Sequence, residues 1–254
     1  MNQPKISIIT VCFNSESTIS ETIESVLNQD FGDFEYILVD GGSKDNTLNI
    51  IAGYADKFHE KGLGYSFRSE PDRGIYDAMN KGISKARGEL IGIINSDDWY
   101  ELSTLGKVWK AYSGLEEKCN TVIYGMIRLW KQNMEYAIRR YHHNFVTTEV
   151  IQHPTCFVPK VVYEKYGMFN PDFRVCGDFD LLNRLHANNV AFNNIDEVLT
   201  NFRIGGATSL HTLTAAAEGL EVKRSFGTIG EEEYKAAIWR IKLRKMLRKY
   251  FRRG

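Results

Sequence analysis

The sequence of 254 residues holds few cysteines, and none of them is spaced as in a metal or disulfide motif. Its four cysteines stand apart at Cys12, Cys119, Cys156 and Cys176, without a C-x-x-C pair. Structural zinc sites and disulfide-stapled folds need close, repeated cysteines. The wide spacing of the four cysteines therefore argues against a structural zinc site and against a disulfide framework, and we expect ordinary buried thiols.

Long apolar runs are missing too. No stretch approaches the roughly 18 apolar residues that a membrane-spanning helix needs. Strand-like sequence begins at Lys5 with no cleavage-site pattern after it, which is unlike a signal peptide. From these two absences we expect a cytoplasmic protein.

Glycine-rich phosphate loops are also lacking. A dinucleotide-binding domain shows G-x-G-x-x-G after its first strand, and a P-loop shows G-x-x-x-x-G-K-[ST]. Here the segment after the first expected strand, residues 12–17, reads CFNSES, and the second pattern occurs nowhere. If this chain binds a diphosphate, we expect a metal ion rather than a glycine loop to neutralise it.

The formal net charge is zero, because 32 basic residues balance 32 acidic ones, but the charges are unevenly distributed along the sequence. Residues 239–254 hold eight Lys or Arg and no acid, which leaves 24 basic against 32 acidic residues elsewhere. An acidic body with a basic tail argues against a nucleic acid partner.

What the chain does have, over its first hundred residues, is regular alternation of strand and helix patterns. Apolar, β-branched runs predict buried strands, and apolar residues at helical spacing follow them. This order is typical of βαβ units, so we expect a Rossmann-like α/β fold with a mostly parallel sheet and helices on both faces. The expected strands are 6–11, 36–39, 65–68 and 90–94, and the expected helices are 18–27, 45–55 and 74–86.

The second half is less regular. We expect one main domain over residues 1–214, with halves that meet near residue 100, and a helical extension over residues 215–254 that ends in the basic tail. The expected elements are strands at 122–130 and 198–202, a short helix at 178–186, and helix from Ala215 onward.

A pair of adjacent acids, Asp97 and Asp98, ends the apolar run 90–94. Two carboxylates at the end of a buried strand repel each other and lose hydration. A divalent cation such as Mg²⁺ would offset this, and it commonly bridges carboxylates to a substrate's phosphates. The alternative is a polar turn that caps a helix starting near Glu101.

Other polar clusters also follow the expected strands. Ligands of open parallel sheets bind beyond the carboxyl ends of the strands. We therefore expect four clusters to meet in one crevice: 11–14, 40–43, 70–74 and 95–98.

The sequence resembles family 2 glycosyltransferases of the GT-A fold. The resemblance rests on five segments in order within residues 4–100: ISIITVCFN, ETIESVLNQ, ILVDGGSKDNT, SEPDRGIYDAMNKGI and INSDDW. It continues more weakly through the segment 151–185, IQHPTCFVPKVVYEKYGMFNPDFRVCGDFDLLNRL, where the family has its acceptor side. Residues 215–254 carry no motif of the family.

The resemblance implies a donor site in the first half. Asp98 matches the metal ligand, for Mn²⁺ or Mg²⁺, and Asp97 its neighbour on the donor side. Many members have a second acid after Asp40, where this chain has Gly41, which leaves the identity of the nucleotide open. The resemblance also implies that Asn80 and Lys81 support the site. The residues matched to the donor site are Val11, Phe13, Asn14, Asp40, Asp72, Arg73 and Asp97.

The resemblance also implies a general base in the second half. Asp178 occupies the matching position, with Asp180 as the fallback. The alternatives are that Asp178 caps the following helix and that Asp180 pairs with Arg184 at i,i+4 spacing. With a single displacement, an α-linked donor would give a β-glycoside.

Three further residues are candidates for an acceptor or flap role. His153 begins the acceptor-side segment, Ser209 lies in a glycine-rich stretch suited to a flap, and His211 is a possible metal ligand. The alternatives are a structural histidine, an ordinary loop, and a lone histidine that binds no metal.

The tail is expected to form an amphipathic basic helix. Such helices bind anionic membrane surfaces, and an oligomer contact, such as a homodimer, is the alternative. A membrane surface suits a lipid-linked acceptor, which by resemblance is an undecaprenyl-diphosphate saccharide at the inner face of the membrane.

Together these features predict an inverting, metal-dependent enzyme that uses a UDP-sugar to build O-antigen, capsule or exopolysaccharide. A sugar nucleotidyltransferase would need a glycine-rich basic loop after the first strand, which is absent. A non-catalytic subunit that binds nucleotide sugars would retain Asp97 and Asp98 and would not need Asp178.

Overall fold

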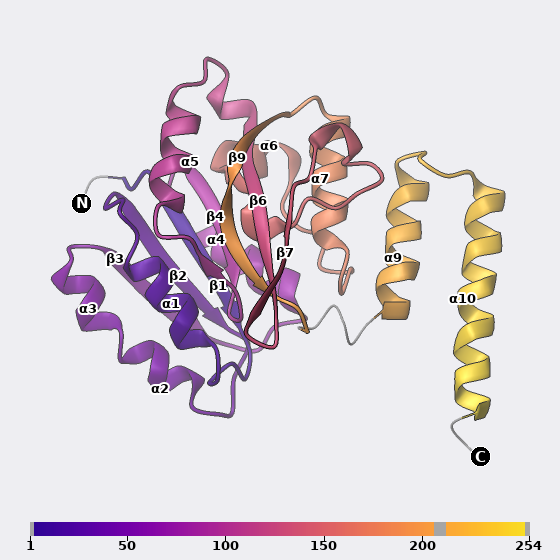
Figure 1. The fold of residues 1–254 in the computed structure, drawn as a ribbon, viewed down its shortest axis with the longest axis horizontal. Helices are drawn as coiled ribbons and strands as arrows, with labels where there is room; N and C mark the ends of the chain where they lie inside the picture. Colours follow the sequence, from indigo (N-terminus) through magenta and orange to yellow (C-terminus); the bar gives the residue numbers. More distant parts are fainter. Residues whose placement is uncertain (1–2, 206–211, 252–254) are drawn as a thin grey trace.

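The computed structural model describes residues 3–205 and 212–251, with side chains through residue 246. One sheet forms its centre, with strands in the order β3-β2-β1-β4-β8-β6-β9-β5, and β7 pairs with β6 (Figure 1). The strands are β1 (Ile6–Cys12), β2 (Phe34–Asp40), β3 (Gly64–Ser69), β4 (Leu90–Asn95), β5 (Trp99–Tyr100), β6 (Thr121–Lys131), β7 (Met134–Arg139), β8 (Phe157–Pro159) and β9 (Ala191–Arg203).

The first half of the sheet is parallel, as the strand–helix alternation predicts. β2, β1 and β4 pair in register from their first residues, with Ile6 opposite both Phe34 and Leu90. β3 continues the parallel arrangement beside β2. Because parallel neighbours end at one edge, the loops after these strands share one side of the molecule.

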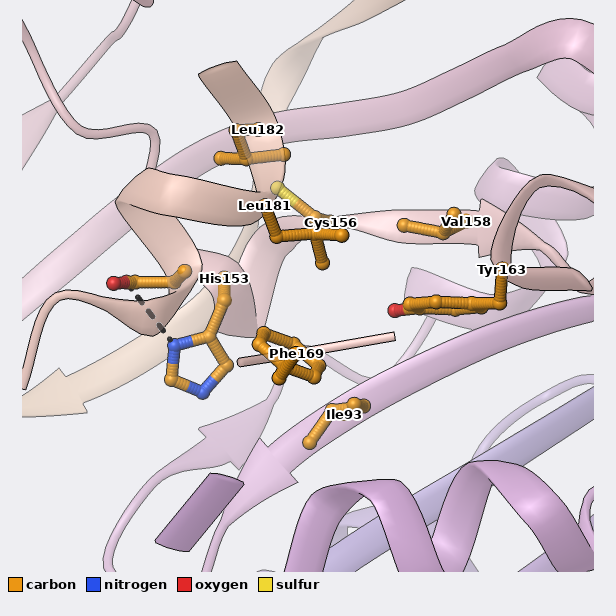
Figure 2. Close-up of a pocket in the computed structure, with 9 residues that line it drawn as sticks. Ile93, His153, Cys156, Val158, Tyr163, Phe169, Leu181 and Leu182 are labelled. Atoms are coloured by element: carbon orange, nitrogen blue, oxygen red, sulfur yellow. Dashed lines mark ion pairs between the residues drawn. The ribbon is translucent and has the colours of Figure 1, made fainter. Parts of the chain in front are cut away.

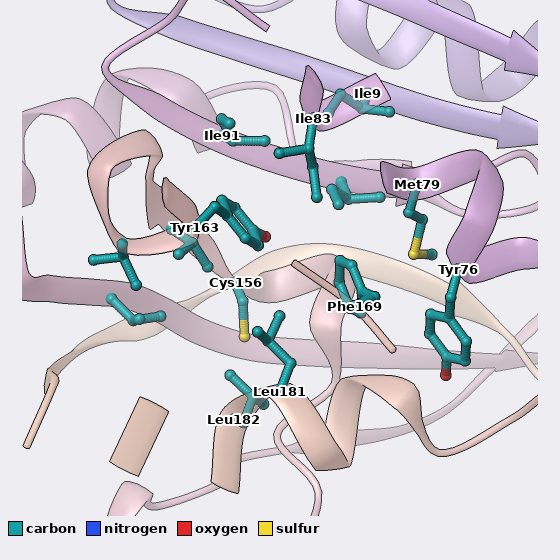
Figure 3. Packing of buried hydrophobic residues seen from close by; sticks show 14 of the residues in the cluster. Ile9, Tyr76, Met79, Ile83, Ile91, Cys156, Tyr163, Phe169, Leu181 and Leu182 are labelled. Carbon is teal, nitrogen blue, oxygen red and sulfur yellow. The ribbon is translucent and has the colours of Figure 1, made fainter. Parts of the chain in front are cut away.

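Helices cover both faces of the sheet. Every residue of β1 is buried, because Ile6 and Ile8 face one layer of helices while Ile9 and Val11 face the other. α1, α2, α3 and α5 supply the first layer, and α4, α6 and α7 the second (Figure 3 shows part of the second). These helices are α1 (Ile19–Leu27), α2 (Thr47–Ala52), α3 (Ala55–Glu60), α4 (Ile75–Lys85), α5 (Thr104–Ser113), α6 (Lys160–Tyr166) and α7 (Gly177–Ala187).

The expected helix over 45–55 is divided in two. α2 ends at Ala52 and α3 begins at Ala55, with Gly53 as the C-cap of α2. Asp45 helps to start α2, because its Oδ1 accepts the backbone N–H and the hydroxyl of Thr47. The helix expected near Glu101 begins later, at Thr104, because β5 intervenes.

The second half departs further from the prediction. The expected strand 122–130 is β6, but it continues into a hairpin with β7 through a turn in which Gln132 and Asn133 have positive φ. The last strand, β9, is far longer than expected and runs parallel to β6. β8 joins the halves by pairing antiparallel with both β4 and β6.

The C-terminal extension forms two helices rather than one. α9 (Thr212–Ser225) and α10 (Glu231–Phe251) are separated by a segment in which Gly227 has a positive φ. In Figure 1, α9 stands beside α7 and α10 lies outermost. Of the helices in the described residues, none has the length and apolarity needed to cross a membrane.

Candidate active site

The loops after the parallel strands meet, as predicted. The hydroxyls of Ser15 and Ser96 lie 2.8 Å apart, which joins the loops after β1 and β4. Asn14 donates its backbone N–H to the Ser43 hydroxyl, which joins the loops after β1 and β2. The loops after β1, β2 and β4 are therefore joined at the carboxyl edge of the sheet.

Asp40 organises the loop after β2. It is buried, and its carboxylate accepts the backbone N–H groups of Gly42 and Ser43, both at 2.9 Å, and the hydroxyls of Ser43 and Ser69. Burial by itself raises the pKa of Asp40, but the bonds from Ser43, Ser69 and Gly42 outweigh it and hold that pKa below its usual value. Asp40 is therefore an ionised group whose oxygens already have partners within the protein.

Asp72 lies over Gly41. A Cβ at position 41 would stand 2.5 Å from Oδ2 of Asp72 and 3.5 Å from the ring of Phe13, so a residue with a side chain cannot replace Gly41 without displacing Asp72. Oδ1 of Asp72 accepts the N–H of Gly74, and among the described residues Oδ2 has no hydrogen-bond partner. The carboxylate and the exposed Phe13 ring thus both lie close to Gly41.

Asp97 and Asp98 follow β4 but differ in their surroundings. Asp98 is only 1% exposed, and its Oδ1 accepts the N–H of Arg203 at 3.0 Å while its Oδ2 accepts the side-chain N–H of Asn95 at 3.1 Å. Asp97 is only partly buried. Burial and then the neighbouring Asp97 raise the pKa of Asp98 well above its usual value, and burial raises the pKa of Asp97 against the charges of Arg203 and His153.

The two acids fit a divalent cation. Both raised pKa values come from burial of negative charge, which a cation would offset, and carboxylate oxygens are the ligands that Mg²⁺ and Mn²⁺ prefer. Within the described residues, no group of three or more His, Cys, Asp or Glu side chains is arranged to hold a metal. A cation held by Asp98 would therefore need further ligands from outside this group, such as a bound diphosphate and water.

His153 links this strand end to Asp178. Its Nε2 lies 3.2 Å from Oδ1 of Asn95, and its Nδ1 lies 3.5 Å from Oδ2 of Asp178, an ion pair when the ring is protonated (dashed line in Figure 2). A small cavity behind them is lined mainly by apolar side chains from β4, β8, α6 and α7. Residues more than 80 positions apart in the sequence thus form one polar chain, and His153 and Asp178 are also part of the lining of this cavity.

Asp178 is held in the first turn of α7. Its Oδ1 accepts the N–H of Phe179 at 2.9 Å and lies 3.4 Å from the hydroxyl of Tyr76. Burial and then the charge of Asp178 raise the pKa of Tyr76 well above its usual value, so its phenol stays protonated. Gly177 makes this packing possible, because a Cβ there would stand 2.7 Å from the Tyr76 ring. Asp178 is not the N-cap of α7, which is Cys176.

Several other predicted residues have partners of their own. Asp180 pairs with Arg184 at 3.0 Å, as the spacing predicts. Arg73 is largely exposed and pairs with Asp77. Asn80 exchanges two hydrogen bonds with the backbone of Phe169 and so supports the site from α4. Val11 is buried in the core, whereas Phe13 and Asn14, which follow β1, are exposed.

The structure adds Tyr76 and Arg203, which sequence reasoning missed, and gives specific contacts to Asn95, which the predicted cluster 95–98 includes. Asn95 contacts both His153 and Asp98, Tyr76 contacts Asp178, and Arg203 brings the end of β9 to Asp98. A role for Asn95 could have been expected from its place two residues before Asp97. The predicted flap residues Ser209 and His211 lie outside the described residues.

Comparison with known proteins shows the family. The family model for glycosyl transferase family 2 matches residues 7–170. A PGL/p-HBAD biosynthesis glycosyltransferase of Mycobacterium bovis is 31% identical over 189 residues, covering 74% of this chain and 72% of that protein. An uncharacterized glycosyltransferase of Rickettsia typhi is 26% identical over 235 residues, covering 86% of this chain and 70% of its own length.

Solved structures share the fold. S. aureus TarS 1–349 in complex with UDP-GlcNAc matches with a TM-score of 0.71 and 19% identity, over 92% of this chain and 70% of that one. The mannosyltransferase PcManGT from Pyrobaculum calidifontis, in complex with GDP-Man and Mn²⁺, matches with a TM-score of 0.66 and 16% identity, over 94% and 70%. The predicted GT-A architecture is confirmed.

Proposed function

The chain belongs to glycosyl transferase family 2 and is a glycosyltransferase, and we propose that it moves a sugar from a uridine diphosphate sugar to a saccharide acceptor with inversion at the anomeric carbon. One observation carries the proposal. His153 contacts Asn95 at the end of β4 and Asp178 in α7, which supports a site in which the proposed metal-binding acids and the proposed base act together. Stabilisation of the fold by UDP-sugars in the presence of Mn²⁺, and its loss with EDTA, tests the proposal.

Asp178 is the proposed general base. An acceptor hydroxyl is a poor nucleophile and needs a base within hydrogen-bond reach. The hydrogen bond from the N–H of Phe179 fixes Oδ1 of Asp178, and His153 lies beside Oδ2, so the carboxylate is oriented before substrate arrives. Attack from the face opposite the leaving group would turn an α-linked donor into a β-glycoside.

Asp97 and Asp98 are the proposed metal site, with Asp98 the ligand and Asp97 the more open carboxylate on the donor side. A bound Mn²⁺ or Mg²⁺ supplies positive charge where the leaving diphosphate becomes more negative. Asn95 and Arg203 hold Asp98 in place through its two oxygens. The mannosyltransferase neighbour in complex with Mn²⁺ supports this assignment.

Phe13 and Asp72 are the proposed contacts for the base of the nucleotide. An exposed aromatic ring offers a stacking surface, and Oδ2 of Asp72, which accepts no hydrogen bond from the part of the chain that the structure describes, can accept an N–H. Uracil presents such an N–H at its N3 position, whereas N3 of cytosine carries no proton. Together with the UDP-GlcNAc bound to TarS, this supports uridine as the nucleoside of the donor.

The tail is the proposed membrane contact, with a lipid-linked saccharide as acceptor at the inner face of the cell membrane. Trp239 and Met246 are exposed on α10, and eight basic residues lie within 239–254. Basic residues near an anionic surface contribute about 1 kcal/mol each. The PGL/p-HBAD biosynthesis name of the mycobacterial relatives supports the class of acceptor only in general terms.

Deletion of residues 239–254 should release the protein from anionic lipid vesicles, because it removes those charges and the apolar side chains beside them. Sedimentation with phosphatidylglycerol vesicles measures this, with neutral phosphatidylcholine vesicles and 0.5 M salt as controls. Binding that is unchanged by the deletion would contradict the membrane role and leave a protein contact, such as a homodimer, as the use of the tail.

A further inference from the structure

A carboxylate from the C-terminal extension holds the segment that leads into α7. Glu218 of α9 accepts three backbone N–H groups, those of Arg174 at 2.9 Å, Val175 at 2.9 Å and Cys176 at 3.0 Å. Hydrogen bonds to an ionised acceptor are about twice as strong as neutral ones. The segment 174–176 is therefore fixed by a helix some forty residues further along the chain.

The same segment is held from its other side by α4. Tyr76 donates its hydroxyl to the carbonyl oxygen of Val175 at 2.6 Å, and that hydroxyl lies 3.4 Å from Asp178. Cys176 adds a contact to α9, because its thiol lies 3.3 Å from the carbonyl oxygen of Ala215. Burial raises the pKa of this thiol to about 12, so it remains protonated and donates. Two helices from distant parts of the sequence thus clamp the residues just before Asp178.

We propose that Glu218 is a positioning residue that sets the place of Asp178 for proton abstraction, and that α9 is in this way a working part of the catalytic site. The inference rests on the proposed function, in which Asp178 is the base. Segment 174–176 ends two residues before Asp178, so a shift of its backbone moves the carboxylate directly. A displacement of about 1 Å at a reacting group can lower a rate by roughly a hundredfold.

The proposed donor residues lie on other elements, after β1, β2, β3 and β4. The loss of Glu218 should therefore lower the rate of transfer and leave binding of the nucleotide sugar intact. If Glu218 only stabilised α9, its loss would not lower the rate of transfer selectively while donor binding stayed intact. The test therefore compares the rate of transfer with donor binding.

Three variants of the full chain test this: Glu218→Gln, Glu218→Ala and, as a matched control, Glu221→Ala. Glu221 lies on the same helix and pairs with Arg224, away from segment 174–176. We expect Glu218→Ala to lower kcat about tenfold or more, with the KM for the UDP-sugar within twofold. Glu218→Gln keeps one oxygen acceptor and should fall between it and the wild type, and Glu221→Ala should match the wild type.

Hydrogen exchange of the backbone amides of residues 174–176 gives a second measurement, in which protection should fall in Glu218→Ala alone. An unchanged kcat in Glu218→Ala overturns the inference, as does a loss equally large in Glu221→Ala or an equal loss of donor affinity. A wild-type enzyme that neither binds uridine nucleotides nor transfers sugar contradicts the proposed function instead, so the two failures are distinguishable.

Discussion

Replacement of Asp178 by Asn should lower the rate of sugar transfer by on the order of a hundredfold or more while donor binding stays within a factor of two. The amide has nearly the shape of the carboxylate and its oxygen can accept the N–H of Phe179, so the first turn of α7 should persist. It cannot take a proton from the acceptor hydroxyl. Single-turnover transfer and calorimetric titration with UDP measure the two quantities separately.

Asp180→Asn is the matched control for this prediction. Asp180 lies two residues away on the same helix, and its carboxylate already pairs with Arg184. We expect it to cost modest stability, within about 1 kcal/mol, and to keep transfer within a few fold. If Asp178→Asn transfers at the wild-type rate while Asp180→Asn does not, the base is Asp180 and the assignment made here is wrong.

Replacement of Asp98 by Ala or Asn should abolish the dependence of nucleotide binding on Mn²⁺ or Mg²⁺. Asp98 is the proposed ligand, and its loss leaves one acid to hold a divalent cation. Calorimetric titration of UDP with metal, and again with EDTA, measures the difference. In the variant the two titrations should coincide at the weaker affinity.

Replacement of Asp98 by Asn should also make the melting temperature of the metal-free protein fall less as pH rises above about 4. The folded-state pKa of Asp98 is raised above 3.8, so the folded protein binds that proton more tightly than the unfolded chain. The carboxyl therefore destabilises the fold as pH rises above its pKa in the unfolded chain and through its pKa in the folded protein. Asn at position 98 carries no such charge. If metal dependence survives in Asp98→Asn and disappears in Asp97→Asn, then Asp97 is the metal ligand and Asp98 is not.

The parallel half of the fold could be predicted because its signals are local. Ile6 to Val11 and Leu90 to Ile94 are apolar on both faces, which only a sheet covered by helices accommodates. The loops that follow such strands must meet at one edge. The convergence of Ser15, Asp40 and Ser96 at the carboxyl edge of the sheet therefore follows from the order of the elements along the chain.

The second half of the fold was harder to predict because its strands form by pairing with strands that are distant in the sequence. β8 has three residues and exists by pairing with β4 and β6 on its two sides. β9 includes exposed and partly buried residues such as Asn193 and Asp196, which carry no alternating pattern, and it forms because β6 pairs along its length. Tertiary contacts decide such elements, and a window of sequence does not contain them.

The candidate site was likewise predictable where its signals are local and not where it depends on contacts between distant residues. Asp97, Asp98 and Asp178 were recognisable from motifs, but their connection through Asn95 and His153 depends on how η3 (His153–Thr155) packs beside the end of β4. The contact between Asp72 and Gly41 likewise joins loops from two strands. Glu218 had no signal in the sequence, because its three partners are backbone groups of a loop about forty residues away.

The melting temperature of the wild-type protein with a panel of nucleotide sugars, each with Mn²⁺ and again with EDTA, tests the central claim most directly. A ligand at a hundred times its Kd stabilises the fold by about 2.7 kcal/mol, which for a chain of this size is a shift of roughly 5 to 10 °C. We predict this shift for UDP-sugars with Mn²⁺ and not with EDTA, and little for CDP-sugars. An equal shift without metal, or none with any UDP-sugar, would contradict the claim that this chain is a metal-dependent transferase that uses a uridine diphosphate sugar.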